Sequence, residues 1–336
     1  MAIRDKRDKA PPPTPFADAV IAYGQGDYAT ALRLFSEAAA AGDAAAQYNL
    51  GFLHDTGRGV PADATAAREW YEKAAEQGYA AAQYKLGDMH ESGRGVPVDL
   101  EAAKRWYQLA AQRNHAAAQY RLAINSDSGH GMPRDPAEAA KWLRKAADQN
   151  HPAAQYALGV KHAKGDGVPK DAVAAIGWYR KAANQNHAGA QFDLGVLHGS
   201  GEGVARNFPE AVRWFQKAAL QQHASAQYNL GVMYGNGRGV VANPLEAVRW
   251  YRQAADQGHA GAQYNLGAIC AAGDSVRADP VEAYKWFTLA AAGFPDSRAP
   301  ARELALDQRA RLAEAMSPEQ VAEGERLAAQ WKPVRS

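Results

Sequence analysis

The sequence predicts an all-α protein built as a solenoid of antiparallel helix pairs, and three of its features lead to this prediction. Two landmark residues recur every 36 positions without a slip, a fixed period that is typical of repeat architectures. The residues around one landmark have the spacing of an amphipathic helix, and a glycine-rich turn recurs between the two helical stretches of each repeat. The landmarks are Gln47, Gln83, Gln119, Gln155, Gln191, Gln227 and Gln263, and Trp70, Trp106, Trp142, Trp178, Trp214, Trp250 and Trp286.

The N-terminal region is expected to contain a flexible segment and then a cap. Residues 1–15 have basic side chains and the run Pro11–Pro13 but no apolar stretch of a signal peptide, so they are expected to form a flexible N-terminal segment. Residues 16–42 are expected to form a degenerate capping helix pair, because Leu34 and Phe35 stand where the later repeats have a Trp-Tyr pair. A solenoid needs such atypical terminal repeats to cover its end faces.

Residues 43–294 are predicted to hold seven repeats of two helices each. In the second helix of the first repeat, Ala67, Trp70 and Tyr71 begin an apolar stripe at helical spacing, and charged side chains occupy the other face. The first helix, AAAQYNLGFLH, is apolar on most sides. Such a helix must be surrounded by its partner and by neighbouring repeats, which indicates one stacked array.

The turn between the two helices contains a glycine pair of a kind that also cradles phosphates. In this chain the pair follows a helix instead of a strand, and its middle residue changes from Arg58 in the first repeat to Glu202 in the fifth. Gly57 and Gly59 are therefore interpreted as positive-φ positions of a chain reversal, with Asp63 capping the next helix.

Residues 295–336 are predicted to form C-terminal capping helices that close the last apolar face. Ser317, Pro318 and Gln320 have the pattern of a capping box with proline at the first helical position. This pattern places the start of the final helix at residue 318.

Composition and charge exclude several classes of protein. With 38 basic and 36 acidic residues the net charge is +2, which gives no reason to expect nucleic acid as a partner. No apolar run approaches the roughly 20 residues of a membrane helix, so membrane insertion is not expected. The single cysteine, Cys270, excludes an intramolecular disulfide and a thiolate metal cluster. A cytoplasmic location fits the sequence as it stands, and a periplasmic or secreted one is the alternative if a signal peptide has been trimmed.

The segment AAQYNLGFLHDTGRGVPADATAAREWYEKAAEQG resembles a Sel1-like repeat, an α/α relative of the tetratricopeptide repeat, and the resemblance extends over seven repeats. It implies a right-handed superhelix of antiparallel helix pairs that acts as an adaptor or scaffold. It also implies protein or peptide ligands on a concave face lined by the first helices. Members of the family work in bacterial signalling, envelope assembly and host interaction, and in eukaryotic protein quality control.

Catalytic and metal-binding patterns are absent from the sequence. It contains no H-E-x-x-H, G-x-S-x-G or S-x-x-K motif, and no cofactor is expected. Histidines recur at two repeat positions, but stacked helices lie about 8–10 Å apart, too far for several of them to hold one ion. Since Tyr79 takes one place in the second ladder, that ladder is expected to have a packing or capping role, and the tryptophans are expected in the core. The ladders are His54, His90, His162 and His198, and His115, His151, His187, His223 and His259.

The clearest candidate for recognition is a row on the first helices whose chemistry changes from repeat to repeat. Asparagine there can hold a peptide backbone with a donor and an acceptor, and a basic residue can pair with a carboxylate. A nearby row of Asp55, Glu91 and Asp127 is acidic only in the first three repeats, which predicts an electronegative rim. The candidate ligand-binding residues are Asn49, Lys85, Arg121, Asp193, Asn229 and Asn265, with Ala157 at the same place in the fourth repeat.

The sequence therefore predicts a non-catalytic, monomeric interaction scaffold that binds a protein or peptide on its concave face. Two alternatives stay open. One is a hydrolase-like enzyme whose groove site no motif reveals, and the other is a consensus-like repeat array without a natural ligand. Irregular stretches such as RLAINSDSGHGMPRD in the third repeat speak against the second alternative.

Overall fold

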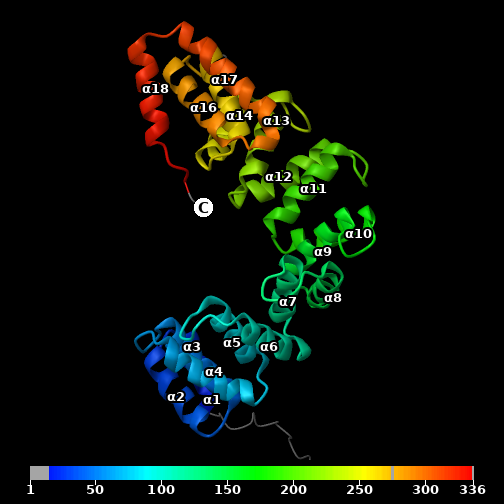
Figure 1. Ribbon diagram of the computed structural model, residues 1–336, viewed down its shortest axis with the longest axis vertical. Coiled ribbons are helices and arrows are strands. Elements are labelled where there is room, and N and C mark those ends of the chain that lie inside the picture. The colour runs from blue at the N-terminus through cyan, green and yellow to red at the C-terminus, as the bar shows by residue number, and fades with distance from the viewer. Residues whose placement is uncertain (1–14, 274–275, 335–336) are drawn as a thin grey trace, which may run out of the picture. The chain divides into compact units, whose positions relative to one another are not determined.

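The computed structural model describes residues 15–273 and 276–334, and in these residues the regular elements are helices (Figure 1). The chain divides into two compact halves, Met1–Pro169 and Lys170–Ser336. Within each half, helices that follow one another along the chain pack side by side. The prediction of an all-α solenoid of antiparallel helix pairs is confirmed.

The helices of the N-terminal half are α1 (Pro15–Gly24), α2 (Tyr28–Ala40), α3 (Ala44–Thr56), α4 (Ala64–Glu76), α5 (Ala80–Ser92), α6 (Leu100–Gln112), α7 (Ala116–Ser128), α8 (Pro136–Asp148) and α9 (Pro152–Lys164). Those of the C-terminal half are α10 (Ala172–Asn184), α11 (Ala188–Ser200), α12 (Phe208–Leu220), α13 (Ala224–Asn236), α14 (Pro244–Asp256), α15 (Ala260–Ala272), α16 (Pro280–Gly293), the short 3-10 helix η1 (Asp296–Arg298), α17 (Ala299–Glu314) and α18 (Pro318–Gln330). The N-terminal segment for which flexibility is expected lies outside the described residues, except for Pro15, which begins α1.

The glycine turns reverse the chain as the sequence predicts. Gly57 ends α3 in the left-handed region at φ 69°, and Gly59 follows at φ 77°. A Cβ on Gly59 would lie 2.7 Å from the carbonyl oxygen of Tyr28, so only glycine allows the preceding repeat to approach this closely. The Asp63 side chain then accepts hydrogen bonds from two N–H groups of α4.

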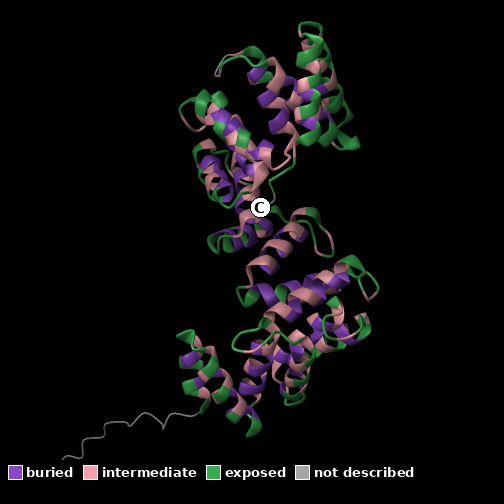
Figure 2. Ribbon diagram, turned by 90° about the vertical axis from the view of Figure 1, so that its left-hand side faces the viewer, coloured by how far each residue is buried: buried purple, intermediate pink, exposed green. Residues whose placement is uncertain are grey.

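In five repeats the core contains an aromatic ring that lies on a helical glycine, whereas the third repeat has Ala123 and Leu143 at these positions. The ring of Tyr71 in α4 is fully buried and reaches to 2.8 Å from the point where a Cβ on Gly51 of α3 would stand. The same arrangement joins Gly87 to Tyr107 and Gly231 to Tyr251. In Figure 2 the buried residues lie within the helices, whereas the turns are mostly exposed. Close contact at the glycine, together with buried leucines of the first helix such as Leu50, therefore holds these pairs together.

The ladder of glutamines is a polar tie between successive repeats. All seven are buried, and each Nε2 donates to the carbonyl oxygen of the alanine eight residues earlier, at 3.0–3.3 Å, near the end of the preceding second helix. The side-chain oxygens of Gln47, Gln119, Gln191 and Gln227 also accept a hydrogen bond from the glutamine thirty residues later, at the end of the next second helix, as in Gln149 to Gln119 at 2.7 Å. The ladder thus gives a second hydrogen bond to carbonyl groups that also accept from a main-chain N–H, as Ala111 does from Asn114.

The second histidine ladder caps the first helices, which confirms its predicted packing or capping role. His115 is the N-cap of α7, and its Nδ1 accepts from the N–H of Ala118 at 3.3 Å. Its ring stacks on Tyr84 of the preceding first helix, with ring centroids 4.9 Å apart. An imidazole that accepts through Nδ1 is neutral, and burial lowers the pKa of all five ladder histidines.

Acidification is expected to destabilise the fold through this ladder. In the unfolded chain the histidines take up protons near the ordinary histidine pKa of 6.5, whereas in the folded chain their pKa values lie lower. The unfolded state therefore binds more protons below about pH 6.5, and stability that is complete above this pH is lost as the pH falls. Urea unfolding between pH 7.5 and 5.5 measures the effect.

The variant His223→Asn is the control for this prediction, because asparagine caps a helix without titrating. His223 is one of five such caps, so the variant should show a shallower dependence of the urea midpoint on pH than the unaltered protein. A midpoint that stays constant over this pH range contradicts the assignment.

The tryptophans pack against the core but are less enclosed than expected. Trp178 and Trp286 are buried, whereas the other five are half-buried. Lysine ammonium groups lie over several of the indole rings, such as Lys73 over Trp70 at 3.9 Å and Lys217 over Trp214 at 4.3 Å from the ring centroid. Each ammonium group over a ring face is attracted by the π electrons of the indole, which covers an aromatic surface that the core leaves half-buried.

The C-terminal helices close the last repeat. Both α17 and α18 pack on α16, and the predicted capping box at Ser317 and Gln320 is present. Beyond α18 the chain runs back to the end of α14, where the Val334 N–H donates to the carbonyl oxygen of Asp256 at 2.8 Å.

Candidate functional site

The six candidate ligand-binding residues, from Asn49 to Asn265, lie on the first helices and are half-buried. They differ in whether other residues of the protein already occupy their polar groups. The Asn49 amide donates to the Ala45 carbonyl of its own helix at 2.8 Å, and Asp193 also interacts within the protein. Arg121 lies 3.7 Å from both Asp88 and Glu91. Lys85 and Asn229 form no hydrogen bond or ion pair with the described residues. A role of these six residues in ligand binding stays a prediction.

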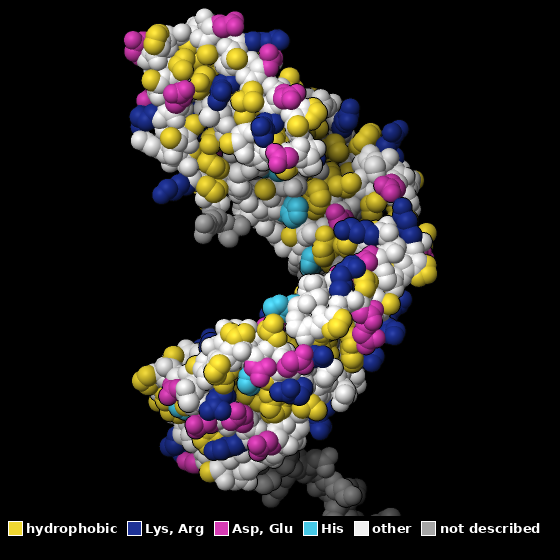
Figure 3. All heavy atoms as spheres, viewed as in Figure 1, with side chains coloured by type: hydrophobic (Ala, Val, Ile, Leu, Met, Phe, Trp, Pro, Cys, Tyr) yellow, Lys and Arg dark blue, Asp and Glu magenta, His cyan; other side chains and the backbone are white. Residues whose placement is uncertain are grey.

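The expectation of an electronegative rim was wrong, because each carboxylate of the acidic row faces a cation from the following repeat. Asp55 pairs with Arg94 at 2.8 Å, and its side chain is only 3 % exposed. Asp127 pairs with Lys161 at 2.7 Å, and Glu91 lies 3.7 Å from Arg121. Figure 3 shows acidic and basic side chains next to one another on this part of the surface. In the N-terminal half the row is thus an internal charge network.

Tyrosines of the second helices complete this network. The Tyr71 hydroxyl donates to Asp55 at 3.3 Å, and the Tyr107 hydroxyl donates to Glu91 at 2.8 Å. Burial and, to a smaller extent, the neighbouring carboxylates raise the pKa of both tyrosines. Because each hydroxyl, carboxylate and cation has a partner, the N-terminal half has little polar capacity left here for a ligand.

The fourth repeat supplies the most buried cation of the network. Lys161 is 4 % exposed at a position where other repeats have Leu53, Met89 or Ile269, and its ammonium group also contacts Asp166 at 2.9 Å. The hydrogen bond from Lys161 lowers the pKa of Asp166. A buried cation between two carboxylates is held by its partners, so it is not a free recognition group.

In the C-terminal half the carboxylate of this row is missing. The positions equivalent to Asp55 are Gly199, Gly235 and Ala271. At Gly235 a hollow of about 400 Å³ opens between α13, α14 and α15. Its wall is made by Gly235, Asn236, Pro244, Ala247, Tyr251, Asn265, Ala268 and Ile269, none of which has a charged side chain.

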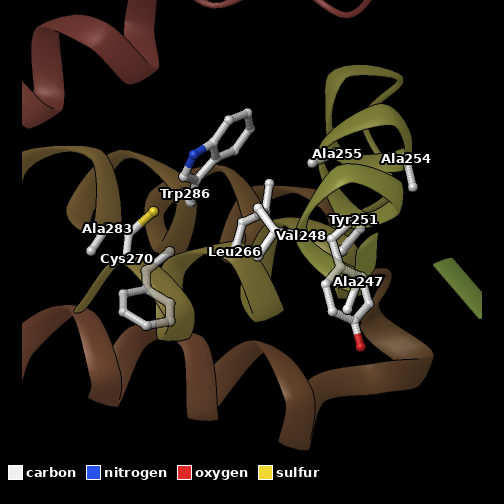
Figure 4. Packing of buried hydrophobic residues seen from close by; sticks show 11 residues of the cluster. Ala247, Val248, Tyr251, Ala254, Ala255, Leu266, Cys270, Ala283 and Trp286 are labelled. Carbon is white, nitrogen blue, oxygen red and sulfur yellow. The ribbon is translucent and has the colours of Figure 1, made fainter. Parts of the chain in front are cut away.

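Tyr251 and Asn265 are the polar groups that define this hollow. Tyr251 is 7 % exposed, and Figure 4 shows its hydroxyl oxygen directed away from the other side chains of the buried cluster. Burial raises the pKa of Tyr251 to about 12, and a hydrogen bond with the Asn265 side chain acts in the opposite direction. An apolar hollow with a few convergent polar groups is the usual form of a binding site.

Groups that support other kinds of chemistry are not gathered in the part of the chain that the structure describes. No three His, Cys, Asp or Glu side chains come together there as they would around a metal ion. The Cys270 thiol is buried, and burial raises its pKa, which makes it a poor nucleophile. No helix in the described ranges has the length and apolar character needed to cross a membrane.

The sequence indicated Asn265 as a candidate but missed Gly235 and Tyr251. A signal for them was present in the repeat columns, where Asp55 and Tyr71 are followed 180 residues later by Gly235 and Tyr251. The aspartate has become glycine, whereas the tyrosine that contacts it in the first repeat is still tyrosine. This difference is noticed only when both repeat positions are compared together.

Comparison with known proteins agrees with this architecture. The sequence profile of the Sel1 repeat matches residues 21–43, 44–79, 80–115, 116–151, 152–187, 188–223, 224–259 and 260–293. The chain is similar to a Sel1 repeat protein from Oxalobacter formigenes, with 32% identity and a TM-score of 0.66 over 71% of this chain and 98% of that one. It is also similar to a protective antigen of uropathogenic Escherichia coli strains with an SLR fold, at 28% identity and a TM-score of 0.46 over 94% of this chain and 83% of that one.

A third similar structure is an immunity protein from Pseudomonas aeruginosa, with 22% identity and a TM-score of 0.38 over 69% of this chain and 81% of that one. No curated protein matches the sequence. Seven contiguous full repeats and one shorter match before them cover residues 21–293. The chain therefore belongs to the Sel1 repeat family.

Proposed function

We propose that this protein is a non-catalytic scaffold that binds a protein or peptide partner on the face formed by its first helices. The observation that supports this most strongly is the contrast between its halves. In the N-terminal half the row is closed by ion pairs of the chain itself, as in Asp55 with Arg94. In the C-terminal half that row lacks carboxylates, and at Gly235 an open hollow lies beside the Tyr251 hydroxyl and the Asn265 amide of the candidate row.

The surface chemistry suits a macromolecular partner better than a reaction. Amides and hydroxyls on successive repeats can bond to the main chain of an extended segment at several points. Repeats that stack only on their neighbours also present such groups at regular intervals, which is how solenoid proteins form long binding surfaces.

Substitution of Asn229 by arginine is expected to lower partner capture at least tenfold. Asn229 has no hydrogen-bond partner among the described residues, so the change should leave the fold intact while it blocks the row. The measurement is the amount of each cross-linked partner recovered from native cells that express the variant, relative to the unaltered protein.

Two further variants show where on the protein the partner binds. Val241→Arg adds the same charge in a turn, at a side chain that is 88% exposed, and is expected to leave capture unchanged. Lys85→Glu tests the row in the N-terminal half, where arginine partners surround the acids, and should reduce capture less than Asn229→Arg. Equal capture by Asn229→Arg and the unaltered protein contradicts the proposal.

A further inference from the structure

Two glycines in the same helix, Gly231 and Gly235, are present for different reasons. A Cβ on Gly231 would lie 2.5 Å from the ring of Tyr251, so packing requires the glycine. A Cβ on Gly235 would meet only the Ala247 Cβ at 3.8 Å and the Tyr251 hydroxyl at 4.0 Å, which is ordinary contact or open space. Its φ is not positive. Glycine inside a helix costs about 0.5–1 kcal/mol relative to alanine, and no contact in the structure accounts for that cost at Gly235.

Gly235 keeps the hollow in front of Tyr251 open. Asp55 occupies the equivalent position in α3, where its carboxylate accepts from the Tyr71 hydroxyl. Any side chain as long as aspartate at position 235 would extend toward the Tyr251 hydroxyl in the same way. The absence of a side chain at Gly235 is therefore the reason why the hollow is open here, whereas Asp55 closes the equivalent place in α3.

The Tyr251 hydroxyl has a hydrogen to donate. The Asn265 side chain forms a hydrogen bond with this hydroxyl. No carboxylate among the described residues accepts from it, whereas the hydroxyls of Tyr71 and Tyr107 donate to Asp55 and Glu91. Tyr251 is only 7 % exposed, and its hydroxyl lines the hollow. An acceptor from outside the chain can therefore take the place that Asp55 has in front of Tyr71.

The lining indicates that this acceptor is uncharged. Pro244, Ala247, Ala268 and Ile269 supply apolar walls, and no cation lines the hollow. Asp55 is stabilised in its place by Arg94, and a ligand carboxylate here would lack such a partner. A carboxylate placed in an apolar site without a cation loses its hydration without compensation, whereas an uncharged main-chain carbonyl loses much less and can accept from the Tyr251 hydroxyl.

We propose that the hollow at Gly235 binds an extended, uncharged segment of a protein partner, with one main-chain carbonyl accepting from Tyr251 and a short apolar side chain against Ala247 and Ile269. The inference rests on the proposed scaffold function and adds to it the chemistry of the ligand. The hollow of about 400 Å³ lies within the range of small binding pockets.

A library of random 12-residue peptides displayed on phage tests this ligand chemistry. The full chain is the bait, and Gly235→Asp, which returns the carboxylate found in α3, is the counter-selected variant. Peptides enriched on the unaltered protein are expected to share an uncharged core of apolar and small residues. The affinity of a synthetic copy should fall at least tenfold with Gly235→Asp and about three- to tenfold with Tyr251→Phe, which loses one hydrogen bond.

Unfolding curves of the variants serve as the folding control, since Gly235→Asp introduces a residue that α3 tolerates at the same position. Asp55→Gly, at the equivalent place in the N-terminal half, is the matched control and should leave peptide affinity unchanged. Equal binding to the unaltered protein and Gly235→Asp, enrichment of a central acidic or basic residue, or no enrichment at all overturns the inference. In each of these cases the scaffold function still stands if Asn229→Arg reduces capture of the native partner.

Discussion

Replacing Gly231 with alanine is expected to destabilise the C-terminal half by about 1–2 kcal/mol. The new methyl group would lie 2.5 Å from two ring atoms of Tyr251, a side chain that is 7 % exposed and packed in a buried cluster. Overpacking of this kind costs about 1–3 kcal/mol, and the higher helix propensity of alanine returns about 0.5–1 kcal/mol. The shift of the urea unfolding midpoint, at constant slope, measures the difference.

The same substitution one helical turn later is the control for this experiment. Gly235→Ala adds a methyl group at 3.8 Å from Ala247, so only the gain in helix propensity remains and the protein should become more stable by about 0.5–1 kcal/mol. Opposite signs for two identical changes in α13 would separate packing from propensity. If both variants shift the midpoint in the same direction, the ring-on-glycine packing does not hold the repeat together.

Replacing Gln119 with leucine is expected to cost about 1–3 kcal/mol, the range for a buried polar group that loses its partner. The side chain is fully buried, and it joins the Ala111 carbonyl, at 3.0 Å, to the Gln149 amide, at 2.7 Å. Leucine has a similar volume but can make neither bond. The measurement is the urea midpoint, with native-state hydrogen exchange locating the loss at the ends of α6 and α8.

Two control variants test whether the effect comes from the buried hydrogen bonds of the ladder. Gln108 is exposed on α6, and Gln108→Leu should change stability by less than about 0.5 kcal/mol. Arg113 stands where five other repeats have a glutamine, and the buried Oε1 of Gln83 has no hydrogen bond. Arg113→Gln should therefore stabilise the protein by about 0.5–1.5 kcal/mol. A Gln119→Leu variant as stable as the unaltered protein would show that the ladder is dispensable.

The fold could be predicted from the sequence because the same residue pattern occurs in one repeat after another. A single glycine pair is ambiguous, but glycines that recur after a helix and before a capping aspartate have one physical explanation, and Gly57, Gly59 and Asp63 confirm it. The role of the histidine ladder was predictable for the same reason. Tyr79 stands at the N-cap position without a side-chain capping hydrogen bond and packs its ring against Tyr48, so it keeps the packing role of the histidines, but it cannot replace them at a metal ion.

The site was less predictable because it depends on which side chains from two different repeat positions contact one another. A row of acids looks electronegative until the cations that face it are known, and Arg94 lies 39 residues from Asp55 in the sequence. The tryptophans were placed in the core, but the lysines that cover them follow only from three-dimensional packing. The monomeric state and the cytoplasmic location stay predictions, since neither depends on contacts within one chain.

The glutamine ladder has a consequence for how such a gene can change its length. Each ladder glutamine is joined to a helix end eight residues before it and, in several repeats, to a side chain thirty residues after it. Recombination between repeats that removes or duplicates a multiple of 36 residues keeps each ladder glutamine eight residues after an alanine at the end of a second helix. A shift that is not a multiple of 36 leaves buried side-chain amides without partners at the junction. Hydrogen bonding between neighbours thus allows the array to lengthen or shorten in whole repeats and penalises every intermediate product.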